Sequence, residues 1–101
     1  MLGLYLEKRI PALNQHRFYI LQVMPTLFGS WAMVREWGRI GHPGTVREMW
    51  FATEAEADAA GEQWRQRKEK RGYRIIERWQ EHRHDSIYRG PNSNPYIVKA
   101  I

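Results

Sequence analysis

The feature that most constrains the fold is a change of hydrophobic pattern near Thr53. Before it, four short runs rich in aromatic and β-branched residues are separated by glycine, proline and polar residues, which is typical of strands joined by tight turns. After it, the chain to about Arg71 has a helical spacing of small and apolar residues. Successive strands with short connections pair as an antiparallel sheet. We therefore predict an α+β fold, with an antiparallel sheet of four to five strands, one long helix packed on one face and an irregular C-terminal extension.

The predicted strands are short and regular. They cover residues 2–6, 17–23, 31–37 and 45–51. Pro11 ends the first run, 25–30 is a hairpin loop, and Gly38–Gly44 is predicted as a turn. Alternation along the third run gives it two faces, Trp31, Met33, Arg35 and Trp37 against Ala32, Val34 and Glu36.

The helix has start and stop signals. Thr53 and Glu56 form a capping box, in which the hydroxyl and the carboxylate satisfy the first free amides, and Gly72 supplies a left-handed terminator. The predicted inward stripe contains Ala57, Ala60, Gly61 and Trp64. Residues 73–76 are either a fifth strand or a return segment.

A chain of 101 residues accommodates one small domain. We place this domain at 1–76. Residues 77–101 form a C-terminal extension that could pack back on the domain, and within it Tyr96–Val98 could be a late strand.

Sixteen lysines and arginines against eleven acidic residues give a net charge of +5 and a pI near 9.9. Half of these cations lie in about one fifth of the chain: Arg65, Arg67, Lys68, Lys70, Arg71, Arg74, Arg78 and Arg83. Such a localised basic segment is typical of a nucleic-acid-binding protein. A solvated helix face that complements the helix dipole explains the same cluster structurally.

Trp37-Gly38-Arg39 closes the third predicted strand and is followed by Ile40-Gly41. An aromatic side chain, a permissive glycine and a guanidinium at a turn can present a ring beside a fixed positive charge. Taken alone, the triplet also fits a core tryptophan, a bend at the glycine, and a surface arginine that pairs with Glu36 or Glu48.

The order of several motifs resembles the WGR domain family over about sixty residues. These are Tyr19 in an early strand, Trp37-Gly38-Arg39-Ile40-Gly41, and the helix end Lys68-Glu69-Lys70-Arg71-Gly72-Tyr73. The family is best known as a DNA-sensing module of eukaryotic poly(ADP-ribose) polymerases and also occurs in small bacterial proteins. The resemblance implies a sheet-and-helix fold and DNA binding.

The resemblance also implies residue roles. Trp37 would pack against a sugar at the 5′ end of a DNA break, and Arg39 would contact the terminus or a neighbouring domain. Gly38 lies between these two residues in the motif. From its charge, Arg35 would add attraction for phosphate, and so would Lys68 and Arg71 if the helix end faces the same way. The polymerases couple their WGR domain to a catalytic domain that this sequence does not contain, so Trp37 and Arg39 could instead serve folding or docking onto another protein.

Other functional classes find little support in the residue inventory. The chain has no cysteine, which removes disulfides, thiolate ligands and thiol nucleophiles. His82 and His84 have metal-site spacing but no further clustered ligand, and there is no nucleophile elbow or phosphate-binding glycine loop. We predict no enzyme, metal, cofactor or small-molecule substrate. With no membrane-length apolar run and no signal-like N-terminus, we predict a cytoplasmic protein that does not enter membranes.

We therefore predict a non-catalytic module that binds nucleic acid, with duplex DNA or its ends preferred to RNA, through backbone charge and sugar packing and without base readout. The alternative is a protein–protein adaptor that uses the aromatic surface around Trp31 and Trp37, or the Tyr96–Val98 segment. A continuous positive surface joining Arg39 to the helix end would favour nucleic acid. An exposed apolar patch near Trp37 would favour the adaptor.

Overall fold

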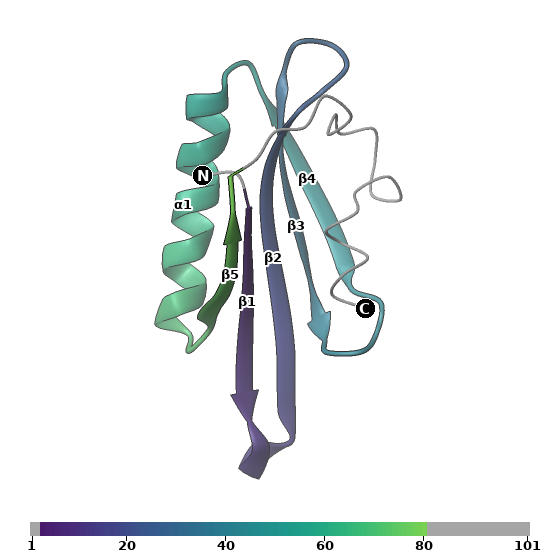
Figure 1. Cartoon of the computed structure of the whole chain (residues 1–101), viewed down its shortest axis with the longest axis vertical. Coiled ribbons are helices and arrows are strands. Elements are labelled where there is room, and N and C mark those ends of the chain that lie inside the picture. The colour runs from purple at the N-terminus through teal and green to yellow at the C-terminus, as the bar shows by residue number, and fades with distance from the viewer. Residues whose placement is uncertain (1–2, 81–101) are drawn as a thin grey trace.

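The computed structural model describes residues 3–80 of the chain. Their elements, in order, are β1 (Gly3–Ile10), the 3-10 turn η1 (Pro11–Leu13), β2 (Gln15–Pro25), β3 (Trp31–Arg39), β4 (Thr45–Phe51), α1 (Glu54–Lys70) and β5 (Arg74–Trp79). All neighbouring strands are antiparallel, in the order β4-β3-β2-β1-β5. α1 packs against β2, β3 and β4 and lies along one face of the sheet (Figure 1). The predicted α+β fold is confirmed, and the segment after Gly72 is a fifth strand.

β1 and β2 are both longer than predicted and form an extended hairpin. Their pairing runs from Gly3 opposite Gln22 to Ile10 opposite Gln15, and η1 turns the chain between them (Figure 1). Asn14 closes the turn with a φ of 53°, a left-handed conformation that asparagine tolerates better than most residues. The residues near the tip are charged or polar, so they show no alternation of apolar and polar side chains. Cross-strand pairing rather than burial holds them in the sheet.

β3 continues through Gly38 and Arg39, so the turn predicted for Gly38–Gly44 begins two residues later. Phe18 pairs with Gly38, and Arg17 pairs with Arg39. The chain then reverses through Gly41, whose φ of 86° is in the region that favours glycine. The Trp-Gly-Arg triplet is therefore held on a paired strand next to the turn.

α1 follows its predicted signals closely. Thr53 is the N-cap, and its hydroxyl oxygen accepts a hydrogen bond from the Glu56 amide at 3.2 Å. The Glu56 carboxylate accepts from the Thr53 hydroxyl at 3.0 Å, so this carboxylate reaches the cap by a different bond from the one predicted. Gly72, with a φ of 97°, lies two residues past the helix end. The predicted stripe is confirmed: Ala57 and Gly61 are buried, while Ala60 and Trp64 pack against the core.

Buried side chains lie on both faces of the sheet. The helix side contains the main core: Leu4, Leu6, Tyr19, Leu21, Val23, Met33, Ala57 and Tyr73. The second face has two smaller clusters, Met24, Ala32 and Val34 in one and Phe18 and Ile20 in the other. As a result, β2 is buried at seven successive positions, from Phe18 to Met24.

The C-terminal part of the chain is only partly described. β5 pairs with β1 as far as Trp79 opposite Gly3. The remainder of the predicted extension, including His82, His84 and Tyr96–Val98, lies outside the described residues.

Candidate nucleic-acid interface

Strand register places three cations in a row across the sheet. Lys8 of β1 pairs with Arg17 of β2, and Arg17 pairs with Arg39 of β3. Directly paired residues project from the same face, and this row lies two positions from the buried Leu6 and Tyr19 on the helix side. Like charges directly opposite one another destabilise a sheet. An anion bound across the row would offset that repulsion.

The end of α1 brings Lys68 and Arg71 to the same region. The Lys68 ammonium lies 4.7 Å from the ring centre of Tyr19 and 5.5 Å from that of Tyr73. Burial lowers the pKa of Lys68, and four neighbouring charges lower it further: those of Arg71, Arg35, Arg17 and Lys8. All four of these charged groups are cations. The helix end and the strand row therefore share one field of positive potential.

Trp37 lies at the rim of the helix-side core and is half-buried. Its ring stacks on Tyr19 with centroids 6.0 Å apart and an interplanar angle of 21°. The Arg35 guanidinium carbon is 5.0 Å from the Trp37 ring centre and 3.8 Å from that of Trp64, and Arg35 donates a hydrogen bond to the Tyr19 hydroxyl at 3.3 Å. Arg35 thus holds the three rings together, while part of Trp37 stays open to solvent.

Two tyrosines complete the aromatic part of the site. Tyr19 and Tyr73 meet edge to face, with centroids 6.0 Å apart. Burial is the main cause that raises the pKa of each hydroxyl, and hydrogen bonds from Arg35 to Tyr19 and from Arg17 to Tyr73 partly oppose it. Both hydroxyls therefore remain protonated and uncharged at neutral pH, so they do not reduce the positive potential.

Arg39 is oriented by the tip of the β1–β2 hairpin. Its guanidinium donates to the backbone oxygen of Asn14 at 3.1 Å and to the Asn14 side-chain oxygen at 3.2 Å, and not to Glu36 or Glu48. Beside it is a hollow of about 220 Å³ lined by Asn14, Gln15, His16, Arg17, Gly38 and Arg39. A Cβ atom at Gly38 would lie 3.2 Å from the Gly44 Cα atom, so this glycine permits close packing under the motif rather than a bend.

Comparison with known proteins fits this geometry. Residues 3–80 match the WGR domain family, which is more than half of the chain. The chain belongs to the WGR domain family. It is 35% identical over 98 residues to y4dW of Sinorhizobium fredii, an uncharacterized protein, covering 91% of this chain and 48% of that relative. The chain therefore spans about half the length of this curated relative. No solved structure matches this chain.

The WGR domain brings the predicted site residues Arg35, Trp37, Lys68 and Arg71 to one face, with Arg39 in the adjoining row. Four contributors were missed by the sequence interpretation: Lys8, Arg17, Trp64 and Tyr73. The helical spacing of Trp64 predicts only a core position, and the sequence around Tyr73 indicates only a family motif. Lys8 and Arg17 looked like ordinary surface charges, and only the register of the hairpin places them beside the motif.

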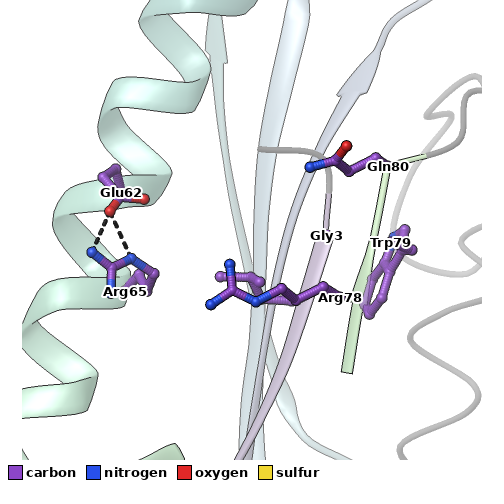
Figure 2. A pocket seen from close by; sticks show the side chains of 7 residues that line it. Gly3, Glu62, Arg65, Arg78, Trp79 and Gln80 are labelled. Atoms are coloured by element: carbon purple, nitrogen blue, oxygen red, sulfur yellow. Dashed lines mark hydrogen bonds and ion pairs between the residues drawn. The ribbon is translucent and has the colours of Figure 1, made fainter. Parts of the chain in front are cut away.

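Part of the basic segment does not belong to this interface. Arg65 forms ion pairs with Glu62 and Glu69, and its Nε donates to Glu62 at 2.6 Å. Figure 2 shows Arg65 and Glu62 joined on α1. Together with Arg78 and Trp79 they line a small hollow of about 80 Å³. The hydrogen bond from Arg65 is the largest of the causes that lower the pKa of Glu62. This end of the basic segment is neutralised by acidic partners.

Over residues 3–80, the WGR domain has no helix long and apolar enough to cross a membrane. In the same range there is no group of three or more histidine, cysteine, aspartate or glutamate residues placed to hold a metal ion.

Proposed function

We propose that this WGR domain binds nucleic acid, with duplex DNA or DNA ends as its ligand, through backbone charge and sugar packing and without base readout. The observation that supports this most is the environment of Lys68, where every charged group that shifts its pKa is a cation and two tyrosine rings lie within 6 Å. A half-buried ammonium among like charges is costly unless an anion approaches it. A polyanion with a regular spacing of phosphates meets that requirement.

Each part of the site has a proposed task. The open part of Trp37 packs on a sugar, a contact that tolerates any base. Arg39, with Arg17 beside it, forks onto phosphate oxygens, while Lys68 and Arg71 attract the backbone on the helix side. Arg35 stabilises the rings and adds charge. DNA is proposed in preference to RNA because of the family's DNA-sensing members, and no catalytic step belongs to the proposal.

The adaptor alternative receives less support from the position of its aromatic residues. Trp31 and Trp37 are half-buried against the helix-side core. The large apolar side chains that are most open lie elsewhere: Phe28 is 81% exposed and contacts Trp50, which is 46% exposed. In contrast, the row of Lys8, Arg17 and Arg39 lies beside Lys68, which belongs to the end of α1. A protein partner remains part of the proposal only as a second ligand, and the predicted cytoplasmic location would place the protein with intracellular nucleic acid.

The test is a fluorescence-anisotropy titration of a labelled blunt duplex carrying a 5′-phosphate, competed by an uncut circular duplex and by a single strand. We expect the circle to compete poorly. Trp37→Leu should weaken binding by about fivefold or more, since one lost aromatic stacking contact costs at least about 1 kcal/mol. Lys68→Ala should weaken binding without altering the preference for ends.

Arg74→Ala is the matched control for charge. Arg74 is exposed and pairs with Glu7, on the face of the sheet opposite α1. Its loss changes net charge as much as the loss of Lys68 but should leave the affinity nearly unchanged. Thermal melts of each variant separate lost contacts from lost folding, since Trp37 also packs on Tyr19. Absence of binding by the folded wild-type domain even at low salt would reject the proposal, and equal competition by the circle would remove the preference for ends.

A further inference from the structure

Three arginines from three elements gather near Trp64, on the face of the sheet that carries α1. Arg35 of β3 and Arg47 of β4 are directly paired, so both project from this face. The guanidinium carbon of Arg35 lies 3.8 Å from the Trp64 ring centre, and that of Arg67 lies 4.8 Å from the same centre. We call Arg35, Arg47 and Arg67 the arginine cluster.

The contacts that hold the arginine cluster do not neutralise its charge. Arg35 donates to the Tyr19 hydroxyl at 3.3 Å, and Arg47 donates to a backbone carbonyl oxygen at 2.9 Å. Both acceptors are uncharged, as is the ring that Arg67 contacts. Arg65, only two residues before Arg67, is instead paired with two glutamates of the same helix. Because like charges that are opposite one another destabilise a sheet, an anion near Arg35 and Arg47 would offset their repulsion.

β3 determines where the arginine cluster lies relative to the motif. Arg35, Trp37 and Arg39 are alternate residues of β3 and project from one face. The arginine cluster and the row of Lys8, Arg17 and Arg39 therefore lie on opposite sides of Trp37. Arg39 is four positions beyond Arg35, which is about 13 Å along a strand. About four nucleotides of one nucleic-acid strand cover that distance, at about 3.4 Å each.

We infer that the arginine cluster binds unpaired nucleotides that extend past a duplex end, so that this domain prefers DNA ends with a single-stranded overhang. The inference rests on the proposed function, in which the duplex lies over the row of cations and its terminal sugar packs on Trp37. The arginine cluster is on the far side of Trp37 from that row. What lies beyond the last base pair of a DNA end is an overhang, and a blunt end has none.

The chemistry of the arginine cluster suits a single strand. An unpaired segment presents phosphates together with the faces of its bases, and single-strand sites combine cationic and aromatic side chains for this reason. A guanidinium group pairs with phosphate, and its plane stacks on an unpaired base. Arg47 and Arg67 are exposed and can make such contacts. Stacking tolerates any base, so the sequence of the overhang should matter little.

The experiment compares three labelled duplexes with the same paired sequence and 5′-phosphates. One is blunt, and the others carry an overhang of about four nucleotides at the 3′ ends or at the 5′ ends. In anisotropy titrations we expect the wild-type protein to bind one of the overhang duplexes at least about fivefold more tightly than the blunt duplex, the effect of about one stacked base. Its salt slope should be steeper for that duplex by about 1.4, since two neutralised phosphates of a single strand contribute about 0.7 each.

The double variant Arg47→Gln/Arg67→Gln removes the two exposed cations of the arginine cluster and leaves Arg35, which also supports the aromatic rings. It should lose the preference for the overhang. Its affinity for the blunt duplex should stay within about twofold of wild type, because salt screens charges that the duplex does not contact. The matched control is Arg74→Gln/Arg78→Gln, which removes two exposed charges from β5, at the opposite edge of the sheet from β4. The control should keep the preference.

Equal affinity of the wild-type protein for blunt and overhang duplexes would overturn the inference and leave the proposed function intact. An overhang preference that survives in Arg47→Gln/Arg67→Gln would overturn it as well. The same holds if this variant loses as much affinity for the blunt duplex as for the overhang duplex, since the cluster would then contact the paired part. Failure of the wild-type protein to bind any of the three duplexes would reject the proposed function, and the inference with it.

Discussion

At the scale of single residues, Glu36 shows how much the second face changes a side chain's chemistry. It is 2% exposed, and burial raises the pKa of its carboxyl group, although a hydrogen bond from the Gly44 amide partly opposes the shift. Its Oε2 atom has no hydrogen-bond partner among the described residues. Alternation in the sequence correctly placed Glu36 and Trp37 on different faces of the same strand. It also allowed Glu36 to be a surface residue paired with Arg39. The alternation identifies the side of the strand and does not reveal that both sides are buried.

The buried carboxyl predicts a pH dependence of stability. The folded pKa of Glu36 lies above its ordinary value of 4.5. Between the two values the native state holds a proton that the unfolded chain has lost, so the free energy of unfolding falls as pH rises through this window. Glu36→Gln should remove that fall and be more stable than wild type at pH 7, with the difference shrinking below pH 4.5. Urea denaturation from pH 4 to 8 measures it. Glu48→Gln, exposed on the same face, is the control, and parallel curves for wild type and Glu36→Gln would contradict the prediction.

At the scale of elements, the ends of the helix were predicted well from nearby residues, whereas the ends of the hairpin strands, which depend on pairing with another strand, were not. α1 was predicted because Thr53, the apolar stripe and Gly72 each act within a few residues of their own position. The sequence ends β1 too early and starts β2 too late, because the pairs near the hairpin tip, such as Arg9 with His16, are polar and depend on the partner strand. The same pairing carries Lys8 and Arg17 into the site. The missed length of the hairpin therefore explains why the pairing of Lys8 with Arg17 was not predicted, but not why Trp64 and Tyr73 were missed.

The helix cap is the element-scale prediction. Thr53→Ala removes the acceptor for the Glu56 amide and should lower the free energy of unfolding by about 1 kcal/mol, the usual cost of losing an N-cap. Chemical denaturation followed by circular dichroism measures the change. Thr53→Ser keeps the hydroxyl and should stay within a few tenths of wild type. If the serine variant loses as much as the alanine variant, the methyl group of Thr53 matters and the hydrogen bond does not.

At the scale of the whole molecule, the fold determines which basic residues lie close together, and their order in the sequence does not. Lys8 and Lys68 are sixty positions apart, yet Lys8 contributes to the lowered pKa of Lys68. The sequence identified the basic segment but did not show that its residues have two different surroundings. Lys68 and Arg71 lie near the row of Lys8, Arg17 and Arg39, whereas Arg65 is neutralised by Glu62 and Glu69. That division depends on where α1 crosses the sheet, and no local pattern encodes it. The family resemblance supplied Trp37 and Arg39 because its motifs keep the order of the elements.

The last prediction uses salt to count the phosphates that this surface neutralises. If Lys8, Arg17, Arg39, Lys68 and Arg71 each neutralise one phosphate of duplex DNA, the logarithm of the association constant should fall with the logarithm of salt concentration with a slope of about −4.5. Arg17→Ala should weaken binding at every salt concentration and make the slope shallower by about 1. Arg74→Ala should change neither, although both variants lower the net charge equally. Anisotropy titrations at four or more salt concentrations provide the slopes. Equal effects of the two substitutions would mean that net charge, and not the row beside Trp37, determines binding.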